Sequence, residues 1–179
     1  MVGVDSTFLS LMLHPKARPP LDPATKKPIE KMEQRIEALL ERLAEDGEAI
    51  IVPTPVLSEF LILAGRDGPK YLALIETTKT ILVVPFDQKA AVELAAIESS
   101  HRSAGSKKGG SASPYQKVKL DRQIVATVKA HTGHTIYADD TDIRNFALRA
   151  GIKVVSTWEL PIPPSPHPLL DDSGGPLDI

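Results

Sequence analysis

The sequence has no cysteine, no excess of positive charge and no long apolar run, and each absence excludes a class of protein. Without cysteine the chain forms neither disulfide bonds nor thiolate zinc sites, and a cytoplasmic location is the expected one. The formal net charge of −2 excludes a uniformly basic surface that would bind nucleic acid through bulk charge. No run of about 18 apolar residues occurs, so we expect no membrane-spanning helix.

The N-terminal segment MVGVDSTFLSLML is apolar but does not have the features of an export signal. Asp5 interrupts the apolar run, no basic segment precedes it, and no small-residue cleavage site follows. We interpret it as the first strand of the fold, with residues 7–13 continuing the apolar run.

The length of 179 residues and the 42% hydrophobic content fit one globular domain with tails. We expect this domain over residues 1–158, with flexible insertions at about 14–28 and 99–114. The first insertion is rich in proline, and the second contains mainly small, polar and basic residues. The proline-rich segment 159–179 is expected to be a disordered tail.

Short apolar runs alternate along the chain with segments whose apolar residues recur at helical spacing. Such alternation predicts an α/β fold, an αβα sandwich whose central, mostly parallel sheet is covered by helices on both faces. Strands are expected at 2–4, 49–52, 81–84, 134–138 and 153–156. Helices are expected at 29–46, 54–64, 69–77, 87–99, 115–131 and 141–150.

Several acidic residues occupy positions where a simple surface charge is not expected. Asp5 lies within the first apolar run, and Asp139, Asp140 and Asp142 follow the strand HTIYA directly. Ligands of such folds bind at the carboxyl ends of the strands, so these carboxylates are candidate site residues. We interpret Asp139, at the junction of strand and helix, as the N-cap of the next helix and leave it out of the site.

Two further acids lie on helices that are otherwise apolar on their inward side. Glu59 lies in PVLSEFLILAG, and Asp121 precedes Val125 and Val128 at helical spacing. Converging ionised carboxylates repel each other and need a positive partner. No Lys or Arg stands at an obvious pairing position, and an all-oxygen ligand set suits Mg²⁺ or Mn²⁺, so we hypothesise a metal site. Taken singly, each acid is better explained as a helix N-cap, a surface charge or a solvated strand end, but the set together favours the metal site.

Four segments together resemble the PIN-domain nucleases, the family that includes the VapC toxins of VapBC toxin–antitoxin pairs. These segments are VGVDSTFL, PTPVLSEF, KLDRQIVATVKAH and IYADDTDIRNFALRAGIKVVS. The resemblance covers about residues 1–156 and implies a metal-dependent ribonuclease, the toxin of a type II toxin–antitoxin pair. It implies RNA as substrate and an antitoxin and a second copy of the chain as partners, with no membrane involved.

The resemblance also assigns the site residue by residue. The acids that it makes catalytic are Asp5, Glu59, Asp121 and Asp140, and the implied ligands of Mg²⁺ (or Mn²⁺) are Asp5, Asp121, Asp140 and Asp142. Ser6 and Thr7, the hydroxyl residues beside the first acid, would support the ligands.

Three alternatives remain open at this stage. Arg102, Lys107 and Lys108 could guide RNA to the acidic site, or they belong to a solvated insertion without that role. His131 and His134 could bind zinc, although they flank the helix-breaking Gly133 and no cysteine is available. The domain as a whole could be a catalytically inactive PIN-like binding module, or a receiver-like domain in which an aspartate accepts phosphate.

Overall fold

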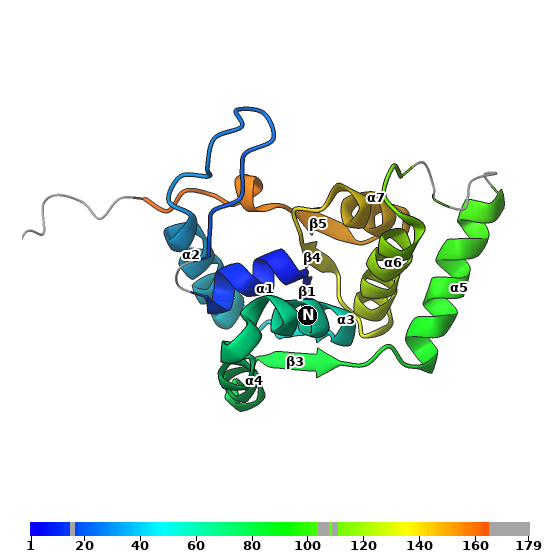
Figure 1. Cartoon of the computed structure of the whole chain (residues 1–179), viewed down its shortest axis with the longest axis horizontal. Coiled ribbons are helices and arrows are strands. Elements are labelled where there is room, and N and C mark those ends of the chain that lie inside the picture. The colour runs from blue at the N-terminus through cyan, green and yellow to red at the C-terminus, as the bar shows by residue number, and fades with distance from the viewer. Residues whose placement is uncertain (15–16, 104–107, 109–110, 165–179) are drawn as a thin grey trace, which may run out of the picture.

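The computed structural model describes residues 1–14, 17–103, 108 and 111–164. These residues contain one central five-stranded sheet. Its strand order is β3-β2-β1-β4-β5, and every neighbouring pair is parallel. The predicted α/β class with a parallel central sheet is therefore confirmed (Figure 1). The strands are β1 (Val2–Val4), β2 (Ile50–Pro53), β3 (Ile81–Val84), β4 (Thr135–Tyr137) and β5 (Lys153–Val155).

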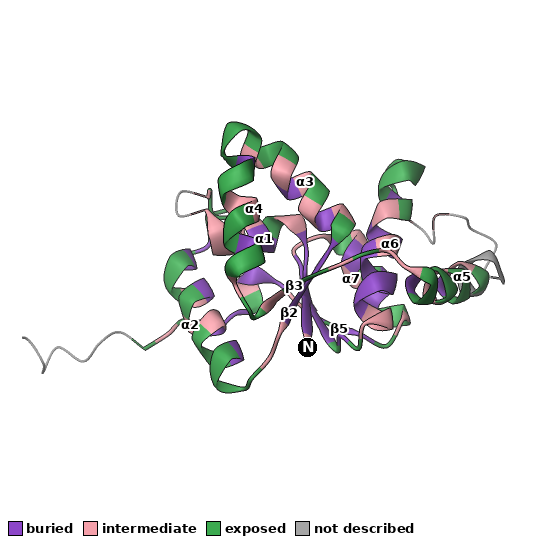
Figure 2. Ribbon diagram, turned by 90° about the horizontal axis from the view of Figure 1, so that it is seen from below, coloured by how far each residue is buried: buried purple, intermediate pink, exposed green. Residues whose placement is uncertain are grey.

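Helices cover both faces of the sheet. In Figure 2, α1, α2 and α4 lie on one side and α6 and α7 on the other, and α5 packs on the outer side of α6. The helices are α1 (Ser6–Leu13), α2 (Met32–Glu45), α3 (Thr54–Ala64), α4 (Gly68–Thr77), α5 (Gln88–Ser103), α6 (Tyr115–Ala130) and α7 (Thr141–Arg149). Short 3-10 helices occur at Gly65–Asp67 and Thr157–Glu159.

The strand order reverses between β1 and β4. From β1 the chain continues to β2 on one side, whereas from β4 it continues to β5 on the other. The helices that follow these two strands, α1 and α7, therefore lie on opposite faces (Figure 2). Such a reversal leaves a crevice at the carboxyl ends of the strands. It also rules out the receiver-like alternative, whose fold has strand order 2-1-3-4-5.

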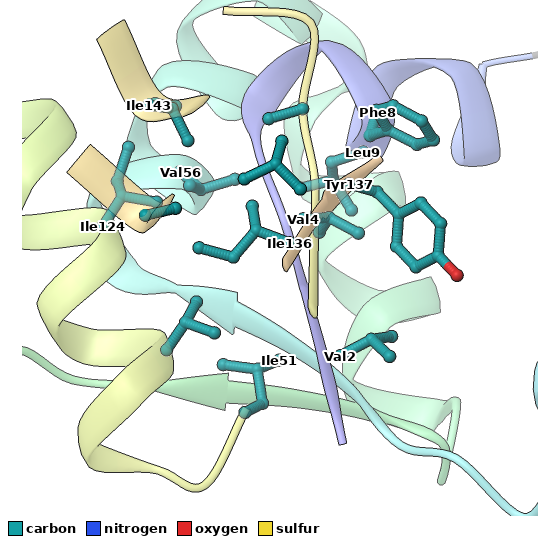
Figure 3. Packing of buried hydrophobic residues seen from close by; sticks show 14 of the residues in the cluster. Val2, Val4, Phe8, Leu9, Ile51, Val56, Ile124, Ile136, Tyr137 and Ile143 are labelled. Atoms are coloured by element: carbon teal, nitrogen blue, oxygen red, sulfur yellow. The ribbon is translucent and has the colours of Figure 1, made fainter. Parts of the chain in front are cut away.

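The core on the α1 side contains the side chains of Val2 and Val4 together with Phe8 and Tyr137, whose ring centroids are 5.4 Å apart (Figure 3). On the opposite face of β1, Gly3 allows α6 to approach closely. A Cβ atom at Gly3 would lie only 2.4 Å from Cγ2 of Val128. This contact fixes the position of α6 against β1.

Helix α1 differs from the predicted continuation of the first strand. Residues Ser6–Leu13 are helical, and Asp5 caps the helix by accepting a hydrogen bond of 2.8 Å from the backbone N–H of Phe8. The run STFLSLML is only eight residues long, and the periodicity of so short an apolar run does not distinguish a helix from a buried strand.

Two segment ends also differ from expectation. Helix α5 continues to Ser103, beyond the expected end at residue 99. At the other end of the chain, Leu160 is buried in the core although the tail was expected from residue 159. None of the helices built from the described residues is long and apolar enough to cross a membrane.

Candidate metal centre

Three carboxylates converge at the carboxyl edge of the sheet. Asp121 comes from α6, and Asp140 and Asp142 come from the start of α7, directly after β4. One oxygen from each of the three lies within 4.8 Å of the others. We call these three residues the acidic cluster.

The packing of α6 on the sheet brings Asp121 to this place. It lies two helical turns before Val128, the residue that packs on Gly3 of β1. Asp121 is buried, like Val125 on the same face of α6. Burial raises the pKa of Asp121 to about 6, against the lowering effect of a hydrogen bond from Lys117.

Asp140 holds its place because it caps helix α7. Its Oδ1 accepts hydrogen bonds from the backbone N–H groups of Asp142 and Ile143, at 2.7 and 3.2 Å. This leaves Oδ2 directed toward the cluster. The predicted N-cap was Asp139, and that assignment is wrong. The carboxylate of Asp139 instead accepts hydrogen bonds from the backbone N–H and the hydroxyl of Thr157, both at 2.8 Å.

Asp5 follows β1, the neighbour of β4, and lies beside the aspartates that follow β4. Its side chain is only 4% exposed, and its Oδ2 accepts a hydrogen bond of 3.3 Å from the backbone N–H of Asp139. Burial raises the pKa of Asp5 to about 7, and the negative charges of Asp139 and Asp140 add to this shift, while the hydrogen bond from Phe8 opposes it. Such a carboxylate favours a nearby cation when ionised.

Lys117 is the residue that sequence reasoning missed. Its Nζ lies 2.9 Å from Oδ2 of Asp121 and 2.7 Å from Oδ2 of Asp140. The expectation that no Lys or Arg pairs with these acids is therefore wrong. The signal was present in the sequence, because Lys117 and Asp121 are four residues apart on one helix. Although burial lowers it, these two contacts raise the pKa of Lys117 overall.

Asp142 is held by hydroxyl groups from the segment before α6, which the sequence did not indicate. Ser111 and Ser113 donate hydrogen bonds to its Oδ2, at 2.8 and 2.6 Å. Burial raises the pKa of Asp142, but these hydrogen bonds and the charge of Lys117 lower it overall. The other oxygen of Asp142 is not engaged in these two bonds.

The donor set of the cluster fits a hard divalent cation. It consists of carboxylate oxygens alone, the ligand class of Mg²⁺ and Mn²⁺. The ammonium of Lys117 lies between Asp121 and Asp140, which shows that this position accommodates a positive charge.

Residues 29–149, more than half of the chain, match the PIN domain family. The chain belongs to that family. The resemblance inferred from the sequence motifs is thereby confirmed, and family membership supports a nuclease. No curated protein matches the sequence.

Solved structures with a similar fold come from VapBC systems. The chain is 12% identical to a protein in the structure of VapBC2 from Rickettsia felis bound to a DNA fragment from its promoter, with a TM-score of 0.54 and coverage of 87% of this chain and 98% of that one. VapC20 from Mycobacterium tuberculosis, a toxin that cleaves the sarcin–ricin loop, gives 13% identity, a TM-score of 0.51 and coverage of 81% and 94%. DNA-bound VapBC from Salmonella typhimurium gives 16% identity and a TM-score of 0.51, with coverage of 88% of this chain and 99% of that one. At these identities the likeness establishes the fold.

The remaining candidate residues of this PIN domain lie outside the acidic cluster. Glu59 is partly buried in α3, which packs against both α1 and α6, but it does not belong to the group of converging carboxylates. Ser6 begins α1 directly after Asp5 and is partly buried. Thr7 is exposed and lines a groove of about 640 Å³ between α1 and α3.

The basic residues of the second insertion are described only in part. Lys107 and the side chain of Arg102 lie outside the described residues. Lys108 is partly buried, and its carbonyl accepts a hydrogen bond of 3.2 Å from the backbone N–H of Ser111. The hydroxyl of Ser111 contacts Asp142, so Lys108 is three residues before a residue that touches the acidic cluster.

The two histidines do not form a shared site. The ring of His131 lies 3.5 Å from Asp87, whereas the ring of His134 contacts Thr135 and Glu48. The zinc alternative therefore has no support from the geometry of the described residues.

Proposed function

We propose that this protein is a ribonuclease that depends on Mg²⁺ or Mn²⁺ and acts as the toxin of a type II toxin–antitoxin pair. The observation that carries the proposal is the convergence of Asp121, Asp140 and Asp142 at the reversal of strand order in a PIN domain. Ligands of open α/β sheets bind at this place. Buried Asp5 is not one of the three converging carboxylates, but the negative charge of Asp140 helps to raise its pKa.

In this proposal Asp5, Asp121 and Asp140 are the principal ligands and, with Glu59, the catalytic acids. Asp142 completes the ligand set, and Glu59 acts directly or through water. Backbone N–H groups hold Oδ1 of Asp140 and both oxygens of Asp5, so the two helix-capping carboxylates are oriented before a cation binds. The divalent cation would supply the positive charge that polarises the phosphodiester and activates water for attack.

The test is RNA cleavage by wild-type protein with and without EDTA, beside the variant Asp140→Asn. We expect EDTA to abolish cleavage and Asp140→Asn to lower it by about a hundredfold or more, because removal of a ligand costs transition-state stabilisation. Asp46→Asn is the matched control, because it removes the same charge from an exposed residue just after α2. Cleavage that persists in EDTA would contradict the metal-dependent mechanism.

The toxin role rests on the fold shared with VapC proteins that were solved in VapBC complexes. It predicts a neighbouring gene for a short DNA-binding antitoxin that binds this chain. Expression of the toxin alone should arrest growth, co-expression of the antitoxin should restore it, and Asp140→Asn should not arrest growth. A homodimer of this chain is also part of the proposal, and sedimentation of the purified protein alone would test it.

The RNA contact is proposed for Arg102, Lys107 and Lys108. Phosphate contacts by these residues predict that RNA affinity falls steeply with salt. Replacing Lys107 and Lys108 by Ala should make this dependence shallower, and an unchanged dependence would assign them to a solvated insertion.

An inactive PIN-like binding module is the second candidate, and Lys117 is the observation that favours it. Because its ammonium offsets part of the negative charge of Asp121 and Asp140, the cluster is compatible with a stable fold without metal. Purified protein that binds Mn²⁺ but cleaves no RNA would support this candidate over the ribonuclease.

A further inference from the structure

The ammonium of Lys117 occupies the place where the proposed site needs its divalent cation. It contacts one oxygen each of Asp121 and Asp140, at 2.9 and 2.7 Å. In Asp140 this is Oδ2, while Oδ1 is committed to the cap of α7. The ammonium therefore uses the oxygen of Asp140 that remains for a cation.

An ammonium and a divalent cation cannot share these two oxygens at full strength. Mg²⁺ binds carboxylate oxygens at about 2.0–2.1 Å, so an ammonium on the same oxygens would lie within a few ångströms of it. Two cations at that separation repel strongly in a partly buried site. One of them must leave when the other binds.

Lys117 is the partner that can leave. Its side chain is 43% exposed and lies in the first turn of α6, whereas the side chain of Asp121 is 7% exposed. A lysine ammonium stands on a flexible four-carbon stem and can turn toward water without movement of the helix. Asp121 has no such freedom, because its face of α6 is packed on the sheet.

We propose that Lys117 is a built-in counter-ion of the acidic cluster, which a divalent cation must displace and which thereby lowers the affinity of the site for metal. This inference rests on the proposed function, because it assigns the control of metal loading at the same site. Without metal, the ammonium limits repulsion between Asp121 and Asp140 and so stabilises the fold. With metal, the same charge opposes binding.

The test compares Mn²⁺ binding by calorimetry in wild type and Lys117→Met, which keeps an unbranched side chain but removes the charge. We expect the dissociation constant for Mn²⁺ to fall by about tenfold or more in Lys117→Met. Lys119→Met is the matched control, because Lys119 is an exposed lysine of the same helix. It should leave the dissociation constant unchanged.

Thermal unfolding gives a second readout that does not depend on activity. Lys117→Met should unfold at a lower temperature than wild type without metal, and Mn²⁺ should raise its unfolding temperature by more than it raises that of wild type. Lys117→Arg keeps the charge and should retain weak Mn²⁺ binding. This variant separates the effect of charge from that of side-chain packing.

The possible failures are distinguishable. If wild type binds Mn²⁺, Asp140→Asn does not, and Lys117→Met binds no tighter than wild type, then Lys117 is no competitor and only this inference is overturned. If neither wild type nor Lys117→Met binds Mn²⁺, both the inference and the proposed metal site are overturned.

Discussion

Asp5 is the residue at which burial and function oppose each other. A carboxylate that is 4% exposed destabilises the metal-free fold when ionised, yet a ligand for a cation must be ionised. Its pKa of about 7 in the folded protein, against 3.8 for the free group, means that the folded state holds a proton that the unfolded state has lost over this range. The stability of the metal-free protein should therefore fall as the pH rises from about 4 to about 7. Asp121, with its pKa raised to about 6, acts in the same direction.

Asp5→Asn should make that decline with pH shallower and should abolish RNA cleavage. An asparagine side chain still caps α1, and the loss of a buried charge leaves stability at neutral pH unchanged or raised. Urea-induced unfolding at pH 5, 6 and 7 without metal measures the effect. Asp22→Asn serves as control, because a hydrogen bond from Thr25 lowers the pKa of Asp22 and it titrates below this range. An unchanged pH dependence in Asp5→Asn would refute the assignment.

The sequence singled out acids that the structure places at the carboxyl edge of the sheet, but it did not indicate their local partners. Strand-end position and apolar surroundings picked out Asp5, Asp121 and Asp140, because ionised groups rarely occupy such places without a partner. Which of Asp139 and Asp140 caps α7 depends on backbone direction at the strand end, and the sequence does not determine it. The serines that hold Asp142 lie 31 and 29 residues away and become neighbours only through the fold.

At the scale of elements, Arg122 of α6 joins α5 and α7. Its fully buried guanidinium lies 2.6 Å from the carboxylate of Glu98 in α5 and 4.7 Å from the ring centroid of Phe146 in α7. The ring face attracts the cation, and Glu98 offers it a full negative charge. The ion pair thus stabilises the packing of α5 on α6, the helix that carries Asp121.

Glu98→Ala should destabilise the protein by about 3 kcal/mol, the lower end for a broken buried ion pair, because Glu98 is itself partly exposed. The double variant Glu98→Ala with Arg122→Met should be more stable than Glu98→Ala alone, since no uncompensated charge then remains buried. Urea-induced unfolding measures both differences. A Glu98→Ala variant as stable as wild type would show that the ion pair contributes nothing.

Element type was predictable where one apolar stripe faces the core, as in α2, and was not for the short apolar run of α1. Helix α2 follows its sequence pattern closely, with Met32, Ile36, Leu39 and Leu43 buried at helical spacing. Helix α1 does not, because its apolar run is too short to show a helical period and a buried strand fits the same composition. Only the cap at Asp5 distinguishes the two, and that acid was assigned to the site alone.

For the whole molecule, the alternation of strands and helices was enough to predict the parallel sheet, because right-handed crossovers leave few other arrangements. Strand order was not predictable from alternation. That β1 lies beside β4, and so places Asp5 beside Asp139 and Asp140, depends on a contact between segments more than a hundred residues apart. The motif resemblance assigned these acids to one site but gave no strand order.

The boundary of the domain is a further prediction at this scale, and truncation tests it. A chain that ends at Pro164 should unfold with wild-type stability and keep RNA cleavage, because it retains every described contact. A chain that ends at Glu159 should lose about 2 kcal/mol, since it lacks Leu160, whose side chain is 2% exposed and whose carbonyl accepts a hydrogen bond from Arg35. Thermal and urea-induced unfolding of both chains measure the difference. Equal loss in both would mean that residues beyond 164 belong to the folded domain.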